Sequence, residues 1–522
     1  MAMALTGTAL GPPMSAPAHV SVLYTPDSSL SWDSIPSDML LEVASYMRDD
    51  RYALLSLTRV CSYWRQVLVE CPLNWTQIST KYPTKLLKLW LQRSKSVPID
   101  AEICHLPPEL IPLLRPKNIS FRSLRCTLNK KNLLKLFEGL TKVSPNLERL
   151  ELYRRSADQR SQIRLKIISG SMPSLKDLRL ASIDLTPEIL RLRHLVNLEL
   201  AHPFPSLTAV LDLIVSNPLL EMITLSVRCA GKTDPRPNGA VMIPRLRSLT
   251  FGFYSPVPLF HRLSIPRGAT VSFSLWADAE ECETILPDSL EHLHNLSEVK
   301  NLYVQHRSGY WIKASGPSGE VKFEGKNDPD LELQKLPLQF VERFRYAEIR
   351  ECSEAFSKEA YPGWISKVFG RSRNLKTLVI DSCKLATMKY IFRLLSPQHN
   401  RAPGAPLRRE SLPCPALSTI ILEVPHDGSW NDWAVPFIQM LRDRAAVGSR
   451  LQKVRIVSNP RVQIPRPGEE KRKQMAKLVR WVEVKYFWYK DGAVDERRAR
   501  ELFEWQHDKE GFSKDDIRVT SD

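Results

Sequence analysis

The hydrophobic positions of the chain follow two different periods. Between residues 35 and 75, apolar side chains recur every three or four residues, which is the period of an amphipathic α-helix. From residue 121 onward the pattern apolar-x-x-apolar-x-apolar recurs, and its alternating end is typical of a short strand with one buried face. The sequence therefore predicts a small helical module followed by a long region of short strands.

The helical module is predicted to contain three helices. Pro36 suits a first helical turn, and an apolar stripe continues from it to Met47. A second helix is expected over 52–60 and a third over 62–70. Since about 45 residues is near the lower limit for an autonomous core, we expect the surplus apolar surface to lie at an interface with a partner.

Three short motifs stand at fixed separations in this module. They are Ile35-Pro36-x-Asp38, Val60-Cys61-x-x-Trp64-Arg65 and Pro72-Leu73-x-Trp75. Together they resemble the F-box, although Ile35 stands where Leu is usual and Asp38 where Glu is common. The resemblance covers about 45 of the 522 residues. It implies a docking module for the Skp adaptor and, through it, the cullin of a RING ubiquitin ligase.

By this resemblance a set of apolar residues becomes the candidate adaptor face: Ile35, Pro36, Leu40, Val43, Leu57, Val60, Cys61 and Trp64. The alternative is that several of them, above all Leu57 and Trp64, only hold the three helices together. A DNA-binding helix-turn-helix module is disfavoured, because the third predicted helix carries few of the polar and basic side chains that major-groove recognition needs.

The second pattern repeats along most of the chain. Six clear copies begin at Phe121, Leu147, Leu175, Leu195, Leu220 and Leu246, with separations of 26, 28, 20, 25 and 26 residues. Weaker copies begin at Val299, Phe344, Leu375, Leu417 and Leu451. This spacing is that of leucine-rich repeats, in which each short strand stacks in parallel on the next. The predicted fold class is thus α/β: a three-helix F-box followed by a leucine-rich-repeat solenoid with a parallel sheet on its concave face.

Two groups of polar residues follow from this register. Asn129, Cys352 and Cys383 stand three residues past a strand, where they can satisfy backbone groups of the turn. The side chains that flank the core positions of the strands are expected on the concave face, as candidate contacts to a protein substrate: Arg149, Glu151, Tyr153, Asp177, Arg179, Asn197, Glu199, Tyr303 and Asp381.

The pattern also predicts the domain organisation. We expect a disordered segment over 1–30, the F-box over 31–78, a linker helix and first strand unit over 79–104, the solenoid over 105–460, and a C-terminal cap and tail over 461–522. Loop insertions are expected near 231–239, 306–330 and 396–415. Within the middle insertion, 310–313 and 320–324 flank a Gly-Pro-Ser-Gly turn and suit a hairpin.

Composition narrows the functional classes. Hydrophobic residues make up 43% and charged residues 25% of the chain, and no apolar segment is long enough to span a membrane. Nine cysteines without a C-x-x-C pair suit reduced thiols, so we expect a cytoplasmic or nuclear protein. Gly231-Lys232-Thr233 ends like a phosphate loop, but Ser226 occupies the first glycine position. We therefore expect no catalytic site, metal or cofactor.

The net charge of +17 leaves one alternative open. Residues 115–166 contain 14 Lys or Arg against 4 Asp or Glu, and such a surface could hold nucleic acid, although a solvated outer face is the favoured reading. The sequence thus favours a substrate-recognition subunit of an SCF-type cullin-RING ubiquitin ligase. The alternative is a scaffold outside any ligase, associated with nucleic acid through a basic face.

Overall fold

A computed structural model describes most of the chain between residues 35 and 506. The described residues are 35–48, 50–106, 108–114, 119–129, 131–133, 136, 145–154, 172–183, 185–187, 189–201, 207–226, 240–252, 259, 262–275, 286, 289–306, 310–325, 338–350, 363–381, 383–397, 412–423, 430–458, 469–486, 489–490, 493–494 and 503–506. The chain divides into a helical unit, Met1–Gln77 with Trp90–Lys95, and a sheet unit, Ile78–Leu89 with Ser96–Asp522.

The helical unit contains the predicted three helices. They are α1 (Ser37–Tyr46), α2 (Arg51–Leu57) and α3 (Ser62–Glu70), followed by the 3₁₀ turn η2 (Pro72–Trp75). Asp50 caps α2, because its carboxylate accepts hydrogen bonds from the backbone N–H groups of Tyr52 and Ala53, both at 3.1 Å. Cys61 caps α3 more weakly through Sγ, 3.4 Å from the backbone nitrogen of Trp64.

The core of the helical unit lies between these helices. Its fully buried apolar side chains are Leu40, Ala44, Leu54, Trp64, Leu68 and Trp75. The indole N–H of Trp75 donates to the Leu68 carbonyl at 3.0 Å, which ties the exit of the module to α3. Trp90 meets Trp75 edge to face, with ring centroids 5.0 Å apart, and the Arg93 guanidinium lies 4.4 Å from the Trp75 ring centroid.

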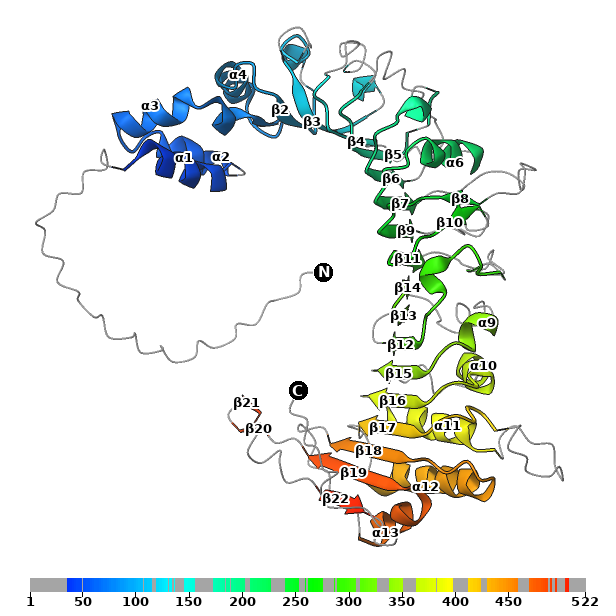
Figure 1. Cartoon of the computed structure of the whole chain (residues 1–522). Helices are drawn as coiled ribbons and strands as arrows, with labels where there is room; N and C mark the ends of the chain where they lie inside the picture. Colours follow the sequence, from blue (N-terminus) through cyan, green and yellow to red (C-terminus); the bar gives the residue numbers. More distant parts are fainter. Residues whose placement is uncertain are drawn as a thin grey trace, which may run out of the picture. The chain divides into compact units, whose positions relative to one another are not determined.

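The sheet unit is built on one large, mostly parallel sheet (Figure 1), to which the described residues contribute 18 strands. Its strands are β1 (Gln77–Ser79), β2 (Ile99–Ile103), β3 (Phe121–Leu128), β4 (Arg149–Arg154), β5 (Asp177–Ala181), β6 (Asn197–Ala201), β7 (Met222–Ser226), β9 (Ser248–Gly252), β11 (Thr270–Leu275), β12 (Asn301–His306), β13 (Tyr310–Gly316), β14 (Gly319–Gly325), β15 (Tyr346–Arg350), β16 (Thr377–Asp381), β17 (Thr419–Glu423), β18 (Lys453–Ser458), β19 (Trp481–Tyr486) and β22 (Phe503–Gln506). Short pairs are β8 (Val241–Met242) with β10 (Leu263–Ser264), and β20 (Tyr489–Lys490) with β21 (Ala493–Val494).

The apolar residues of the predicted pattern are aligned across neighbouring strands. From β4 to β9 the parallel register places Leu150, Leu178, Leu198, Ile223 and Leu249 side by side, and all five are buried. The residues on either side of them along each strand are half-buried or exposed, except Glu151, which is buried; this is the pattern expected when side chains alternate between the two faces of a sheet. The core therefore runs as a continuous stack along one face of the sheet.

Helices and turns cover that buried face. They include α4 (Thr84–Arg93), α6 (Leu207–Val215), α9 (Leu338–Val341), α10 (Gly363–Arg371), α11 (Leu385–Leu395), α12 (Trp430–Ala446) and α13 (Glu469–Leu478), with the 3₁₀ turns η3 (Pro108–Leu110), η4 (Ile189–Arg191) and η6 (His294–Leu296). In Figure 1, α6 and α9 to α12 lie on the same side of the strands. Among the described residues, no helix is both long enough and apolar enough to cross a membrane.

The hairpin predicted between residues 310 and 324 is confirmed. β13 and β14 pair antiparallel, and they are inserted in the sheet between β11 and β12: β14 pairs parallel with β11, and β13 antiparallel with β12. This segment is thus part of the sheet and not a loop outside it. The hairpin turn packs closely, because a Cβ atom at Gly316 would lie 2.1 Å from the Glu298 carbonyl oxygen, and Gly319 has a φ of +140°.

Polar side chains, some of them buried, satisfy backbone groups in the turns between strands. Asn129 accepts a hydrogen bond from the backbone N–H of Asn132 at 2.9 Å, and the Cys383 thiol donates to the Ile349 carbonyl at 3.5 Å. Asn217, which the pattern did not single out, is fully buried and bonds three backbone groups. Cys352, segments 1–30, 231–239 and 398–411, and the tail after residue 506 lie outside the described residues.

Candidate interaction surfaces

The helical unit divides the predicted adaptor residues between its core and its surface. Leu40 and Trp64 are buried, at 1% and 7% exposure, and therefore hold the helices together. Ile35, Leu57 and Cys61 are half-buried, whereas Pro36, Val43 and Val60 are exposed. Only the exposed and half-buried residues among them can meet a partner without unfolding the unit.

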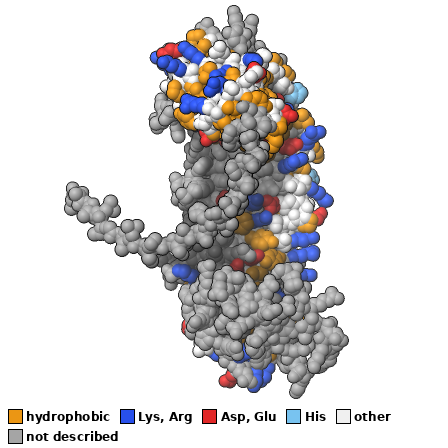
Figure 2. Space-filling model, turned by 90° about the vertical axis from the view of Figure 1, so that its left-hand side faces the viewer, with side chains coloured by type: hydrophobic (Ala, Val, Ile, Leu, Met, Phe, Trp, Pro, Cys, Tyr) orange, Lys and Arg blue, Asp and Glu red, His pale blue; other side chains and the backbone are white. Residues whose placement is uncertain are grey.

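The exposed side of α1 carries a row of large apolar side chains, here called the α1 stripe. Met39, Val43 and Tyr46 are 62%, 44% and 81% exposed. Their spacing of four and three residues places them one above another on a single helix face. Tyr52 and Leu73 are exposed as well, and Figure 2 shows apolar side chains in several patches on the helical unit. Exposed apolar surface of this kind is typical of interaction sites.

In the sheet unit, charged side chains alternate in sign across the solvent-facing side of the first strands. Glu102, Arg125, Glu151, Arg179 and Glu199 occupy matching positions on β2 to β6. The Nε atom of Arg125 lies 3.0 Å from a Glu151 carboxylate oxygen, and that of Arg179 lies 3.7 Å from Glu151 and 3.5 Å from Glu199. We call this row the charge ladder.

A second row of polar contacts runs beside the ladder. Arg149 pairs with Asp177 at 3.0 Å, and the Asn197 amide donates to the same carboxylate. The guanidinium of Arg125 lies 5.6 Å from the ring centroid of Tyr153. Seven of the nine substrate-contact candidates are thus neighbours on β4, β5 and β6. Tyr303 and Asp381 lie on the more distant strands β12 and β16.

The ladder holds Arg179 in the charged form. Burial alone would lower the pKa of Arg179, but a hydrogen bond with Tyr153 and the carboxylates of Glu151 and Glu199 raise it above its ordinary value. The pKa of Glu102 lies below its ordinary value, because hydrogen bonds from Lys81 and Ser79 outweigh the effect of burial. These charges are therefore fixed parts of the surface.

Comparison with known families decides the nature of the helical unit. A family model for F-box-like domains matches residues 32–81. The chain carries an F-box-like domain. F-box domains generally bind a Skp adaptor, and they typically belong to non-catalytic adaptor subunits of ubiquitin ligases. No curated protein matches the chain. The α1 stripe lies within the F-box-like domain, so its exposed apolar side chains coincide with a known docking module.

Ion pairs between neighbouring strands compensate part of the positive charge of the basic region at residues 115–166. Arg122 pairs with Asp100, Arg125 with Glu151, and Arg149 with Asp177. Two of these three carboxylates lie outside the basic region, on β2 and β5. The net charge of one sequence segment does not reveal such partners, because each carboxylate lies on a neighbouring strand.

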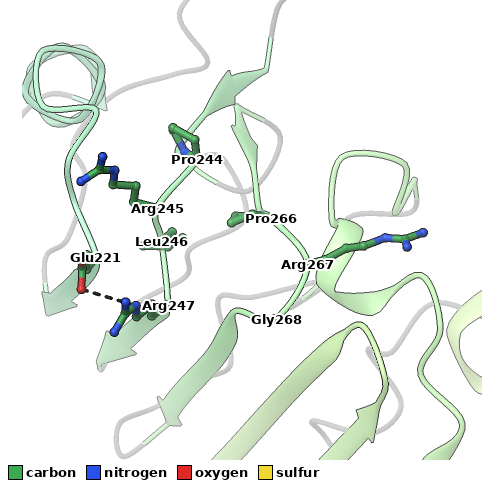
Figure 3. A pocket seen from close by; sticks show the side chains of 8 residues that line it. All are labelled: Glu221, Pro244, Arg245, Leu246, Arg247, Pro266, Arg267 and Gly268. Carbon is green, nitrogen blue, oxygen red and sulfur yellow. Dashed lines mark ion pairs between the residues drawn. The ribbon is translucent and has the colours of Figure 1, made fainter.

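A pocket of the described residues lies where β7, β9 and β11 begin (Figure 3). It has a volume of about 460 Å³ and is lined by Glu221, Pro244, Arg245, Leu246, Arg247, Pro266, Arg267 and Gly268. Arg245 and Arg247 extend on the side of Glu221, whereas Arg267 points the opposite way. The arginines therefore form a rim and do not converge on one point. Apart from Leu246, which begins a copy of the repeated pattern, the sequence did not single out these residues, since they precede the strands and carry no motif.

The described cysteines include three buried thiols. Cys126, Cys383 and Cys414 are buried. Burial raises the pKa of Cys414 to about 12, and it raises the pKa of Cys126 as well. Both thiols are therefore protonated at neutral pH and unsuited to nucleophilic attack. Within the described part of the chain, no group of three or more His, Cys, Asp or Glu side chains could hold a metal ion.

Proposed function

We propose that this protein is the substrate-recognition subunit of an SCF-type cullin-RING ubiquitin ligase. The observation that carries the proposal is the α1 stripe, an exposed apolar row on an F-box-like domain. Through it the protein would bind a Skp adaptor and, through the adaptor, a cullin. Among the predicted adaptor residues, Pro36, Val43 and Val60 are the exposed candidates for direct contact, with Ile35, Leu57 and Cys61 at the edge.

We propose further that the sheet unit is a leucine-rich-repeat array that holds a protein substrate. Support comes from the parallel strands that follow one another along the chain at repeat spacing, with apolar residues in matching register. The proposal keeps the predicted domain boundaries: the F-box ends at residue 78, the linker unit ends at residue 104, and the array ends near residue 460. The polar face of β4 to β6, which carries Arg149, Asp177 and Asn197, is the proposed substrate surface.

The same surfaces could serve a scaffold outside any ligase, so the two functions must be separated by experiment. The full chain is expressed in cells, and proteins that co-purify with it are identified. The ligase function predicts recovery of a Skp adaptor and a cullin, and loss of both on Val43→Asp with Tyr46→Asp. Recovery of other partners with neither ligase subunit would favour the scaffold.

The variant design follows from the burial of the adaptor candidates. Substitutions at Leu40 or Trp64 would unfold the helical unit. Adaptor binding would then be lost whether or not these two side chains contact the adaptor. Val43 and Tyr46 are exposed, so charged side chains there leave the core intact while placing charge in the proposed interface.

A further inference from the structure

One border of the sheet unit carries basic side chains on two runs of neighbouring strands, β9 with β11 and β12 with β15 and β16, and the hairpin β13–β14 lies between the two runs. These side chains directly precede or closely approach the first residues of β9, β11, β12, β15 and β16, and we call them the basic border: Arg245, Arg247, Arg267, Lys300, Arg345 and Lys376. All are exposed except Lys300, which is half-buried. In Figure 2, Lys and Arg side chains recur down one margin of the sheet unit.

Backbone hydrogen bonds fix three of these residues side by side. The N–H of Arg345 donates to the Lys300 carbonyl at 2.7 Å, and the N–H of Lys376 donates to the Arg345 carbonyl at 2.8 Å. Adjacent strands lie about 4.8 Å apart, so the three side chains start from neighbouring points along one line. Like charges at this spacing repel one another unless an anion lies between them.

The border differs from the charge ladder in how its charge is compensated. In the ladder, each arginine faces a carboxylate on a neighbouring strand. Among the described residues, no carboxylate forms an ion pair with Lys300, Arg345 or Lys376. Within the described residues, the arginines of the ladder are therefore paired with carboxylates, whereas Lys300, Arg345 and Lys376 form a line of uncompensated cations at the border.

The other half of the border surrounds the 460 Å³ pocket and is partly compensated. Arg247 pairs with Glu221 at 3.4 Å and Arg267 with Glu298 at 3.5 Å, yet both arginine side chains remain largely exposed. The pocket also has apolar walls at Pro244, Leu246 and Pro266. A ligand that lies here must offer negative charge and tolerate both carboxylates and apolar surface.

We propose that the basic border and its pocket bind an extended, carboxylate-rich polypeptide segment. This proposal rests on the proposed function, since it names the chemical class of the partner that the sheet unit would present to a ligase. Spaced carboxylates can pair with Lys300, Arg345 and Lys376, while an intervening apolar side chain enters the pocket beside Leu246. Flexible lysine and arginine side chains adjust to the spacing of such a segment.

A nucleic-acid strand fits the border less well. Consecutive phosphates would meet Glu221 and Glu298, which interrupt the row of positive charge. A polypeptide can carry uncharged residues at these two positions, whereas every phosphate of a nucleic-acid backbone is charged.

Fluorescence anisotropy of the purified full chain tests the proposal. The probe is a labelled peptide in which Glu alternates with Gly, compared with the same peptide carrying Gln and with single-stranded DNA of equal charge. We expect salt-sensitive binding of the Glu peptide, and a loss of about tenfold or more in the variant Lys300→Gln, Arg345→Gln, Lys376→Gln. The matched control Lys85→Gln, Lys88→Gln, Arg393→Gln removes three exposed cations elsewhere and should change affinity less than about twofold.

Three results would overturn the proposal. They are equal losses in both variants, tighter binding of the DNA that depends on the border, and no binding of the Glu peptide to the full chain. Recovery of the Skp adaptor by the same variants separates this proposal from the proposed function. Intact adaptor recovery with lost peptide binding supports both, whereas peptide binding without adaptor recovery would contradict only the ligase role. Thermal unfolding of each variant checks that the sheet unit is folded.

Discussion

Arg125 on β3 and Glu151 on β4 form an ion pair between neighbouring parallel strands, with the Arg125 Nε atom 3.0 Å from a Glu151 carboxylate oxygen. Glu151 is only 6% exposed and also lies 3.7 Å from Arg179, so one buried carboxylate compensates two arginines. Across a sheet, opposite charges at facing positions stabilise the pairing and like charges weaken it. The charge ladder therefore helps to set the register of the first strands as well as the polarity of their exposed face.

Replacing Glu151 with Gln should destabilise the sheet unit by about 1 to 2 kcal/mol, because two half-exposed arginines lose their shared carboxylate. Denaturant unfolding of Glu151→Gln, Arg125→Gln and the double variant measures this. We expect a coupling between the two positions in the double-mutant cycle. Strictly additive losses would contradict the ladder as an interacting unit.

Asn217 is predicted to be a main polar support between the segment before β6 and helix α6. Its side chain accepts from the Leu195 N–H at 3.0 Å and donates to the carbonyls of Leu192 at 3.0 Å and Leu213 at 2.7 Å. Asn217→Ala should cost about 2 to 4 kcal/mol of unfolding free energy, because three buried backbone groups lose their partner. Asn374→Ala is the control: that amide donates to the Glu342 carbonyl at an exposed position, and its loss should be much smaller.

Acid should destabilise the hairpin through Glu320. Its carboxylate lies 2.6 Å from the Lys313 ammonium and 2.7 Å from that of Lys322. Burial raises the pKa of Glu320, but the two lysines outweigh it and place the pKa below the ordinary value of 4.5. Since the folded-state pKa is the lower one, the stabilisation is present above that ordinary value and is lost as pH falls through the folded pKa.

The pH dependence of the thermal midpoint tests this assignment. Glu320→Gln should lower the midpoint at neutral pH and flatten its fall in acid. Glu324→Gln, on the same strand at an exposed position, should follow the wild-type curve. Identical curves for wild type and Glu320→Gln would show that the lysines do not stabilise the hairpin.

Substitutions in the core of the F-box-like domain should destabilise it, whereas substitutions on its exposed surface should leave its stability nearly unchanged. Leu40→Ala and Trp64→Ala remove buried side chains and should each cost about 2 to 5 kcal/mol, whereas Val43→Ala and Tyr46→Ala should stay within about 0.5 kcal/mol. Hydrogen exchange over α1 to α3 in the full chain reports this locally. Equal loss of protection in all four variants would contradict the division between core and stripe.

The local parts of the fold could be predicted from the sequence, because they depend on spacing along the chain. The copies that begin at Leu147 and Leu175 gave the strands β4 and β5, and the turn between residues 316 and 319 gave the hairpin. The strand β11 was missed, since only Val271 and Phe273 keep the alternation there without the preceding apolar position of the pattern.

The long-range parts could not be predicted. Insertion of the hairpin between β11 and β12 depends on its pairing with β11, which joins residues 50 positions apart such as Thr270 and Glu320. The ion pairs of the ladder join residues 20 or more positions apart, so Arg125 carries no sign in the sequence that Glu151 will neutralise it. The exposed side of α1 could be foreseen as apolar, but the burial of Leu40 and exposure of Val43 depend on how α3 packs against it.

The central claim is that the F-box-like domain binds a Skp adaptor through the α1 stripe. Isothermal titration of the purified full chain with purified Skp adaptor measures it most directly, with Val43→Asp, Tyr46→Asp as the test variant and Gln92→Asp, Ser96→Asp as a control that adds the same charge at exposed positions. We predict saturable binding by wild type and control, and a loss of about a hundredfold or more in the test variant. Equal affinity of all three proteins, or no binding by wild type, would contradict the claim.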